Sequence, residues 1–256
     1  MIPIKSNSFE RHLKRLIPDQ VKKIIIMMLI NKFTGRLIKF FKIRFTIIGG
    51  KYNYNLASDL EAAKIFFGLW ESAEIRYSKK YAKSHVVIEL GSSIGVTLAL
   101  LSNIKKNTKF ICLEASSINF KKLQKLRSKL SNRNKYILVN KAISYKADTI
   151  AFEHISTTGS SIDKTPAYSS EIISTITLNQ LILDHCEKER FTLITDIEGA
   201  EADIFFMDKE SLINCNEIIA ELEDTEVHSQ EDQINQLESL GFKLIERYGK
   251  VVVMAR

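Results

Sequence analysis

The amino-acid sequence predicts an α/β protein with a doubly wound, mostly parallel β-sheet. Short apolar runs alternate with segments whose apolar residues recur at helical spacing, as in successive strand–helix units. A glycine-rich turn, Gly91-Ser-Ser-Ile-Gly95, directly follows the first of these runs and precedes a helical segment. Acidic residues stand at the ends of several runs. In an open α/β sheet these ends form the crevice where ligands bind.

The length and composition suit one α/β domain with an extension. The chain has 256 residues, of which 45% are hydrophobic and 26% charged, with only three prolines, so wholesale disorder and low-complexity sequence are excluded. The three cysteines (Cys112, Cys186 and Cys215) form no CxxC motif and have no histidine at ligand spacing. This excludes a disulfide scaffold and a structural zinc site. No apolar run reaches 18 residues, which argues against a conventional membrane span. We therefore expect a cytoplasmic protein.

The net charge of +7 is unevenly distributed and suggests a boundary near residue 56. Residues 1–56 contain twelve lysines and arginines but only two acidic residues, whereas the remainder has 25 basic and 28 acidic residues. We expect a basic, helical N-terminal extension over residues 1–56 and a catalytic domain over residues 57–256. A nucleic-acid enzyme would more typically carry a basic face on its catalytic body as well, so no nucleic-acid partner is expected.

Within the extension, residues 31–45 have the pattern of a basic amphipathic helix. Its apolar positions are Phe33, Leu37, Phe40 and Phe41, and Lys32, Arg36 and Lys39 form an opposing basic stripe. Such a helix, together with the apolar run before it, can make a peripheral contact with the inner face of a membrane through residues 21–45. The favoured alternative is that the apolar face packs on the body of the protein or on a second subunit in a homodimer.

Seven short runs are expected as strands. They cover residues 85–90, 109–113, 136–140, 191–195, 217–223, 241–246 and 250–255. A helix is expected before the first strand, because Ser58-Asp-Leu-Glu61 is a capping box. In this motif the serine hydroxyl and the glutamate carboxylate each accept a hydrogen bond from a free main-chain N–H at the helix start. We expect this helix to continue to Trp70 and to cover the sheet.

The glycine turn and the acids beside it have the pattern of a nucleotide-type site. Glycines at positions 91 and 95 can adopt positive φ and let a ligand approach the main chain without a Cβ in the way. The spacing Glu-x-Gly-x-x-x-Gly differs from the dinucleotide fingerprint, and Glu89 would repel phosphates but could bind an ammonium group. Glu114 ends the second strand about twenty residues further on, where an acid can accept hydrogen bonds from ribose hydroxyls.

A third acidic feature, Asp196-Ile-Glu-Gly-Ala-Glu201, directly follows the strand at residues 191–195. Three carboxylates around one glycine are costly to crowd together unless they meet cations, polar substrate groups or a proton. A helix start, where the dipole favours acids, is the simpler explanation for Glu201 and Asp203. It accounts less well for Asp196, which still belongs to the strand.

Four segments in this order resemble the FkbM-type branch of class I S-adenosylmethionine-dependent methyltransferases. They are Val87-Ile-Glu-Leu-Gly-Ser-Ser-Ile-Gly95, Leu113-Glu-Ala115, Asn140-Lys-Ala-Ile-Ser144 and Thr195-Asp-Ile-Glu-Gly-Ala-Glu201. The resemblance spans residues 85–255 and implies a Rossmann-like, seven-stranded sheet with an antiparallel final strand. Two departures concern the substrate more than the cofactor. Leu178-Asn179 stands where the family pattern leads us to expect Leu-Asp, and the first loop carries serines where the family often has Ala-Asn.

The resemblance also implies roles for individual residues in binding the cofactor, S-adenosyl-L-methionine. Glu89 and the main chain from Gly91 through Ser93 to Gly95 would hold the methionine end. Glu114, with Ala115, would bind the ribose, and Ala142 and Ile143 would flank the adenine. Asp196 would border the cofactor as well as the acceptor.

For catalysis, the resemblance implies methyl transfer to a hydroxyl of a sugar, a glycan or a related small molecule. Asp196 is the first candidate for binding the acceptor or acting as general base, followed by Glu198. His228 is a further candidate base, with an exposed loop histidine as the alternative. Asp196, Glu198 and Glu223 could together hold Mg²⁺ or Ca²⁺, but no metal is expected. The polar insertion around Gly159-Ser-Ser161 is either a substrate-side lid or a simple loop.

Two other functions stay open. One is an RNA or protein methyltransferase on the same fold, because a fold does not determine the substrate. The other is a non-catalytic adenosyl-binding module that the N-terminal helix recruits to membranes. The presence of Glu89, Glu114 and the complete acidic turn favours an enzyme.

Overall fold

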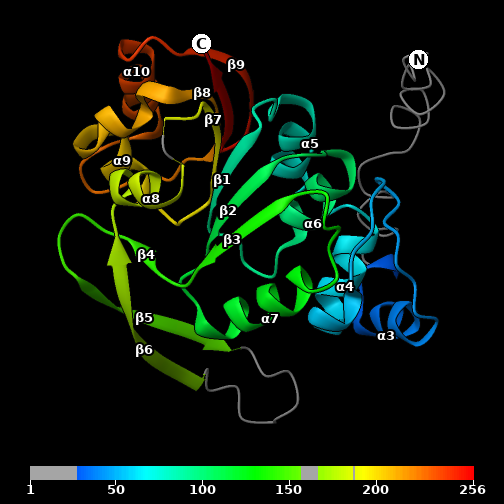
Figure 1. The fold of residues 1–256 in the computed structure, drawn as a ribbon. Helices are drawn as coiled ribbons and strands as arrows, with labels where there is room; N and C mark the ends of the chain where they lie inside the picture. The colour runs from blue at the N-terminus through cyan, green and yellow to red at the C-terminus, as the bar shows by residue number, and fades with distance from the viewer. Residues whose placement is uncertain (1–27, 157–166, 187) are drawn as a thin grey trace, which may run out of the picture.

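The computed structural model describes residues 28–156, 167–186 and 188–256, and its centre is a seven-stranded sheet in the order β3-β2-β1-β7-β8-β10-β9 (Figure 1). The first five strands in this order are parallel, and β10 is antiparallel to both of its neighbours. The bounds are β1 (Val86–Leu90), β2 (Lys109–Leu113), β3 (Lys135–Val139), β7 (Phe191–Thr195), β8 (Cys215–Glu221), β9 (Lys243–Tyr248) and β10 (Val251–Ala255). The predicted doubly wound sheet with its antiparallel closing strand is confirmed, with small shifts at some strand ends.

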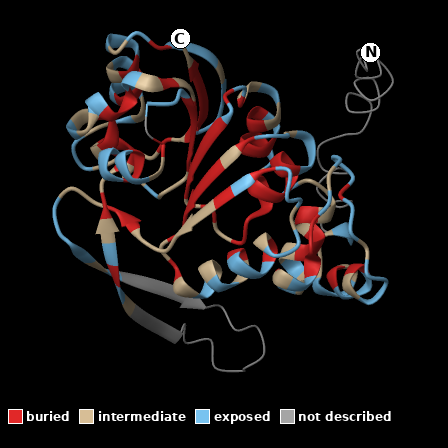
Figure 2. Ribbon diagram, viewed as in Figure 1, coloured by how far each residue is buried: buried red, intermediate tan, exposed pale blue. Residues whose placement is uncertain are grey.

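Helices cover both faces of this sheet. They are α3 (Lys32–Phe40), α4 (Asp59–Phe66), α5 (Ser72–Tyr81), α6 (Val96–Ile104), α7 (Ser117–Arg127), α8 (Leu178–His185), α9 (Glu201–Met207) and α10 (Gln230–Ser239), with short 3₁₀ turns η1 (Tyr54–Leu56) and η2 (Lys209–Asn214). Because successive side chains of a strand point to opposite faces, β1 serves two cores. Val87 packs with α5, α6 and α7, whereas Val86, Ile88 and Leu90 pack with α8, α9 and α10. Figure 2 shows the buried residues concentrated in the central strands.

The segment before β1 forms two helices where one was expected. The capping box is confirmed: the Glu61 N–H donates to Ser58 Oγ, and the Ser58 N–H donates to the Glu61 carboxylate. However, α4 ends at Phe66, and α5 begins only at Ser72. The connection contains Trp70 and Glu71, and Glu71 has a left-handed φ of 42°. The prediction of one continuous helix to Trp70 is therefore wrong. The break between the two helices places Glu71 at the carboxyl ends of the central strands, where the candidate site lies.

The N-terminal helix α3 packs on the body through the side that carries Gly35 and Ile38. Gly35 and Ile38 are buried, and Arg36 and Lys39 form ion pairs with Asp59 at the start of α4, at 3.0 and 2.9 Å. The predicted apolar positions Phe33, Leu37, Phe40 and Phe41 are exposed instead. The expectation that this apolar face packs on the body is therefore wrong, because the side of Gly35 faces the body instead, where a Cβ would overlap with the main-chain oxygen of Asp59. Among the described residues, no helix has the length and apolar character needed to cross a bilayer.

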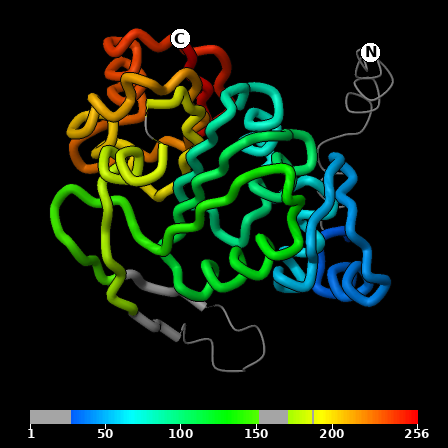
Figure 3. Tube along the Cα trace, in the orientation of Figure 1, coloured from blue at the N-terminus to red at the C-terminus, as the bar shows by residue number. Residues whose placement is uncertain are grey.

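A second, three-stranded sheet projects from the main one, in the order β4-β6-β5. It consists of β4 (Ala142–Ile143), β5 (Thr149–Ser156) and β6 (Ala167–Ile176), and β5 and β6 form a long antiparallel hairpin. The hairpin stands apart from the seven-stranded sheet in Figures 1 and 3. The predicted lid around Gly159-Ser-Ser161 lies outside the described residues. We call β5 and β6 the arm.

Candidate active site

A cavity of about 330 Å³ lies at the carboxyl ends of β1, β2 and β7. Residues from motifs far apart in the sequence line it together, because the carboxyl ends of parallel strands meet at one edge of the sheet. The lining residues are Glu71, Gly91, Ser93, Leu113, Glu114, Ala115, Asn119, Ala142, Ile143, Ile150, Asp196, Ile197, Glu198 and Ala200. Every predicted site residue except Glu89, Gly95 and His228 is among them. We call this space the nucleoside cavity, after the ligand that the sequence resemblance predicts for the residues lining it.

The glycine turn after β1 has the predicted positive φ angles, 82° at Gly91 and 76° at Gly95. A Cβ at Gly91 would overlap with the main-chain oxygen of Asp196, so this glycine lets the turns after β1 and β7 touch. A Cβ at Gly95 would lie 2.5 Å from Leu126 and 2.6 Å from Leu123 of α7. Gly95 therefore makes room for a helix and not for a ligand, which corrects the reason given for this glycine from sequence.

Glu114, at the end of β2, is buried and held in one orientation. Its Oε2 accepts a hydrogen bond from the Ser93 N–H at 2.7 Å, and its Oε1 accepts one from the Ser116 N–H at 2.8 Å. Asn140 fixes the main chain below it, because its amide donates to the carbonyl oxygens of Glu114 and Ala115. A carboxylate oxygen can accept more than one hydrogen bond. The carboxylate can therefore accept hydrogen bonds from a diol in the cavity.

One wall of the nucleoside cavity is apolar. Ala142 and Ile143 form the short strand β4, which pairs with β6, and both are buried. Leu113 and Ile150 also line the cavity. These side chains offer a surface on which a flat aromatic ring can pack without leaving polar groups unpaired. Ile150, at the base of the arm, lies outside the segments quoted for the family resemblance.

Glu89 lies below the cavity and does not line it. Its side chain is buried, and its Oε2 accepts a hydrogen bond from the Cys112 thiol at 3.4 Å. Burial raises the pKa of Glu89 to about 7. To hold the methionine end, as predicted, Glu89 would have to act from beneath the Gly91 turn.

The acidic turn after β7 is shaped by its last carboxylate. Glu201, completely buried, accepts hydrogen bonds from the N–H groups of Ile197 and Gly199 at 2.6 and 2.8 Å and lies 3.4 Å from the Thr195 hydroxyl. Its role is structural, as the helix-start explanation proposed. Glu198 follows with a left-handed φ of 56° and lines the cavity.

Asp196 stands at the centre of this acidic region. Its main-chain N–H donates to the Leu90 oxygen at 3.1 Å, which ties the turn to the end of β1. Burial raises the pKa of Asp196 to about 7, and repulsion from Glu221 and Glu198 adds to this effect. A carboxyl with a pKa near 7 exchanges a proton readily at neutral pH, which suits an acid–base role.

Glu71 is the acidic cavity residue that motif reasoning missed. It enters from the connection between α4 and α5, directly after Trp70. Burial, followed by repulsion from Asp196 and Glu89, raises the pKa of Glu71 to about 8. Its left-handed backbone is costly for a residue with a side chain, and such strain clusters at functional sites. No motif marks this position, and only the helix break before it could have drawn attention to it.

His228 lies away from the nucleoside cavity. Its ring stacks on Phe206 of α9, with the ring centroids 3.7 Å apart, and lines a separate cavity beside Asp203 and Thr225. The prediction of His228 as a base in the same site therefore finds no geometric support. His228 belongs to the loop after β8, and the fold of this loop places it away from the nucleoside cavity.

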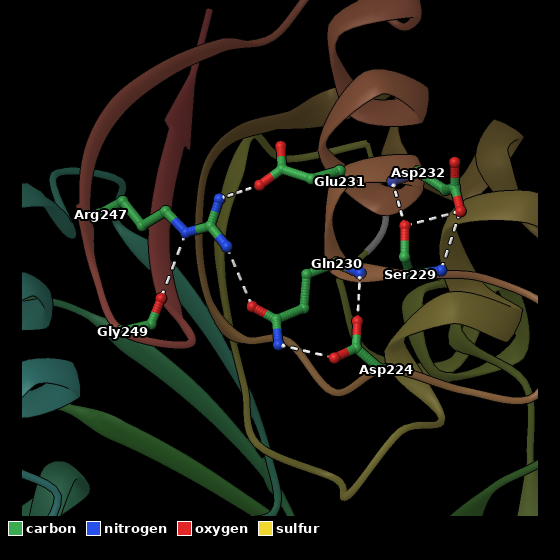
Figure 4. A network of polar contacts seen from close by, with 7 residues as sticks. All are labelled: Asp224, Ser229, Gln230, Glu231, Asp232, Arg247 and Gly249. Atoms are coloured by element: carbon green, nitrogen blue, oxygen red, sulfur yellow. Dashed lines mark hydrogen bonds and ion pairs between the residues drawn. The ribbon is translucent and has the colours of Figure 1, made fainter.

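That loop is held by a polar network at the start of α10 (Figure 4). Asp224 accepts hydrogen bonds from the Gln230 main chain and side chain, and Ser229 and Asp232 form a capping box. Arg247 of β9 donates to Gln230 Oε1 at 3.1 Å and contacts Glu231. The network positions the segment from Asp224 to His228 beside α9.

The three carboxylates considered above as possible metal ligands, Asp196, Glu198 and Glu223, do not line one cavity together. Glu223 is paired with Lys250, whose Nζ lies 2.6 Å from Oε1, and Glu223 does not line the nucleoside cavity. In the part of the chain that the structure describes, no group of three or more His, Cys, Asp or Glu residues is placed to hold a metal ion.

The strand order, the glycine turn and the carboxylate at the end of β2 together define a class I methyltransferase. The model of the FkbM methyltransferase domain matches residues 67–244, so the chain belongs to the FkbM methyltransferase family. The resemblance inferred from the sequence is thereby confirmed. No curated protein matches the chain.

Solved structures with a similar fold are distant in sequence. Fibrillarin from Aeropyrum pernix, bound to S-adenosyl-L-methionine, is 9% identical with a TM-score of 0.44, covering 72% of this chain and 74% of that one. A methyltransferase from Pyrococcus furiosus is 12% identical with a TM-score of 0.39, covering 72% and 81%. The fibrillarin pre-rRNA processing protein of Methanococcus jannaschii is 13% identical with a TM-score of 0.42, covering 68% and 67%.

Proposed function

We propose that this protein is an S-adenosyl-L-methionine-dependent O-methyltransferase that acts on a hydroxyl of a sugar, a glycan or a related polar small molecule. The observation that carries the proposal is that Asp196, with its raised pKa, lines the same cavity as Glu114. A carboxylate placed for a ribose and a second one suited to proton transfer thus share one compartment.

The residues of the cavity fit the cofactor that the family implies. Glu114 is oriented by the Ser93 and Ser116 N–H groups and would bind the two ribose hydroxyls. Ala142 and Ile143 would pack against the adenine. The acidic side of the cavity, at Glu71 and Asp196, would suit the cationic methionine end, because negative charge stabilises an ammonium or a sulfonium. When bound, the cofactor supplies an electrophilic methyl group.

Asp196 would orient the acceptor hydroxyl and receive its proton. An alcohol is far less acidic than a carboxyl, so proton transfer to Asp196 would come late, as the oxygen forms its bond to carbon. The fixed main chain between Leu90 and Asp196 would hold the carboxylate in place during this step. Glu198 is the second candidate for binding the acceptor.

The arm is attached beside the cavity, where it can take part in binding the acceptor. At its base, Ile150 lines the cavity, and Glu171 of β6 accepts a hydrogen bond from the Ser117 N–H at 2.9 Å. This bond ties the arm to the start of α7, next to Glu114. The arm is therefore anchored at the cavity, where it would contact an acceptor that extends beyond it.

The test separates cofactor binding from transfer. We expect S-adenosyl-L-methionine or its demethylated product to raise the melting temperature of the wild type and of Asp196→Asn, but not of Glu114→Ala. Glu210→Ala, an exposed acidic residue of η2, is the control for loss of a carboxylate. Stabilisation by NAD in preference to S-adenosyl-L-methionine would overturn the proposal.

Transfer from the radiolabelled cofactor then identifies the acceptor. The proposal predicts label in cell-envelope carbohydrate and none in RNA or protein. It also predicts a mass increment of one CH₂ on glycans made in the presence of the protein. Labelling of RNA alone would favour the alternative methyltransferase class, and binding without transfer to any acceptor would favour the non-catalytic module.

A further inference from the structure

A second cavity, of about 340 Å³, lies at the other end of α7. It is formed by the strap that follows α3, here defined as residues 41–53, and by the segments after α6 and α7. The lining residues are Arg44, Lys51, Tyr52, Asn53, Ser102, Asn103, Lys105, Lys106, Leu126, Lys129, Leu130, Ser131 and Arg133. We call it the basic cavity.

The charge around the basic cavity is one-sided. Six of its lining residues are lysines or arginines, and none of its lining residues is acidic. Lys105 donates to the Ser84 oxygen, and Arg44 donates to the Asn53 side chain, and both of these acceptors are neutral. The side chains of Lys51, Lys106, Lys129 and Arg133 have no hydrogen bond or ion pair with any residue that the structure describes. Uncompensated cations around a concave surface attract anions.

The basic cavity is separate from the proposed active site. Helix α7 starts beside the nucleoside cavity, to which Asn119 contributes, and ends at the basic cavity, to which Leu126 contributes. The 11 residues of this helix span roughly 16 Å. An anion in the basic cavity would therefore not touch the nucleoside cavity, and the function of the basic cavity is not explained by methyl transfer.

Exposed apolar side chains flank the basic cavity along the chain. Phe40 and Phe41 at the end of α3 are 77% and 67% exposed, and Phe45 and Ile47 of the strap are both 58% exposed. Phe45 forms a bridge with Lys51, which lines the basic cavity. So many large apolar side chains exposed in one short segment mark an interaction site on a protein surface.

We propose that the basic cavity and the flanking side chains of α3 and the strap form a binding site for an anionic membrane surface. A lipid phosphate would enter the basic cavity, and the phenylalanines would insert at the boundary with the acyl chains. Aliphatic residues favour a membrane over single-stranded nucleic acid, because Leu37, Ile47 and Ile48 are exposed in the same segment. Aliphatic side chains partition into lipid but offer no ring on which a base can stack.

The test uses the full-length protein in vesicle flotation. We expect binding to phosphatidylcholine vesicles that contain about a third phosphatidylglycerol, weak binding to pure phosphatidylcholine, and a steep loss of binding as salt is raised. The triple variant Lys106→Glu, Lys129→Glu, Arg133→Glu is expected to lose at least 100-fold in binding, because each basic residue near such a surface contributes about a fivefold increase.

The matched control reverses three exposed lysines outside the basic cavity, with Lys188→Glu, Lys209→Glu and Lys243→Glu. It has the same net charge as the cavity variant and is expected to keep most of the vesicle binding. Phe40→Ser with Phe41→Ser should weaken binding about tenfold or more, whereas Ile213→Ser with Val227→Ser, at exposed apolar positions elsewhere, should not. Melting curves with the cofactor check that each variant is folded.

Three results would overturn the proposal. One is equal losses in the cavity variant and its charge control. The second is displacement from vesicles by millimolar inorganic phosphate, which would assign the basic cavity to a soluble phosphate. The third is tighter binding to a single-stranded RNA oligonucleotide than to the anionic vesicles, abolished by the same triple variant. If the triple variant does not fold, the proposal is tested by how vesicle binding of the wild type depends on salt and on the phosphatidylglycerol content.

Discussion

At the scale of single residues, the candidate site is governed by carboxyl groups crowded where water has little access. Asp196, Glu71 and Glu89 all have raised pKa values, and burial is the largest cause for each. Their neighbours raise the values further, because each added negative charge makes the next ionisation harder. The cavity is therefore preset for a cation or a proton, and the three carboxyls need not play the same part.

Asp196 should control the pH dependence of methyl transfer. Because its pKa is about 7, the fraction of carboxylate, and with it the rate, should rise as the pH rises through 7 and then level off. Asp196→Asn should lower the rate by about 10²-fold or more and remove this rise. Single-turnover rates between pH 5.5 and 8.5 test the prediction. A wild-type profile that stays flat over this range would show that another group takes the proton.

Glu71 should make the empty protein less stable as the pH rises. Its pKa is about 8 in the fold and near 4.5 when the chain is unfolded, so between these values the folded state holds the extra proton. The free energy of unfolding must then fall from pH 5 to pH 8. Glu71→Gln should remove the part of this slope that Glu71 contributes, leaving the part due to Asp196 and Glu89, and gain about 1–3 kcal/mol over the wild type at pH 8. Urea unfolding at pH 5 and pH 8 measures the change in unfolding free energy. The control variant Glu210→Gln should leave the slope unchanged.

At the scale of elements, the turn after β1 and the helix α7 depend on one another. Gly95 begins α6 with a left-handed backbone, and the space above its Cα is occupied by Leu123 and Leu126 of α7. The same helix carries Asn119 to the nucleoside cavity, and its cap Ser116 donates to Glu114. The position of the predicted ribose-binding carboxylate thus depends on how closely two helices approach.

Gly95→Ala should separate backbone strain from packing. The added Cβ meets both a left-handed φ and the leucines of α7, so we expect a loss of about 2–4 kcal/mol in unfolding free energy. Gly249→Ala, in the hairpin between β9 and β10, is the control, because its φ is also positive (60°) but nothing lies within 4 Å of the added Cβ. It should cost only about 1 kcal/mol. If urea unfolding shows that Gly95→Ala and Gly249→Ala lose the same unfolding free energy, α7 can move away from the added Cβ without cost.

At the scale of the whole molecule, the three proposed functions belong to three separate places. The nucleoside cavity lies at the carboxyl ends of the central strands, and the basic cavity lies at the far end of α7. The arm projects from the seven-stranded sheet (Figure 1). The arm pairs mainly with itself, since β5 and β6 form a continuous antiparallel register from Thr149–Ser174 to Ser156–Ala167. Its outer part can therefore be removed without opening the seven-stranded sheet.

Shortening the arm should separate cofactor binding from acceptor binding. Phe152 and Glu171 are register partners, so a short Asn-Gly-type turn can join them in place of residues 153–170. Ile150 and the bond from Ser117 to Glu171 are then kept. We expect affinity for S-adenosyl-L-methionine to change less than about threefold and methyl transfer to fall by about 10²-fold or more. Calorimetry measures the affinity for the cofactor, and radiolabel transfer measures the rate of methyl transfer. Unchanged transfer would exclude the arm from acceptor recognition.

The sequence alone determined the strands of a mostly parallel sheet, the turn at Gly91 and the meeting of Glu114, Ala142 and Asp196. These follow from local patterns, because a parallel sheet brings the carboxyl ends of its strands together whatever lies between them. Only the tertiary structure decided which way α3 faces, why position 95 must be glycine, that His228 turns toward Phe206, and that Glu71 enters the cavity. Each of these depends on contacts between segments distant in the chain, and no local pattern of residues records such contacts.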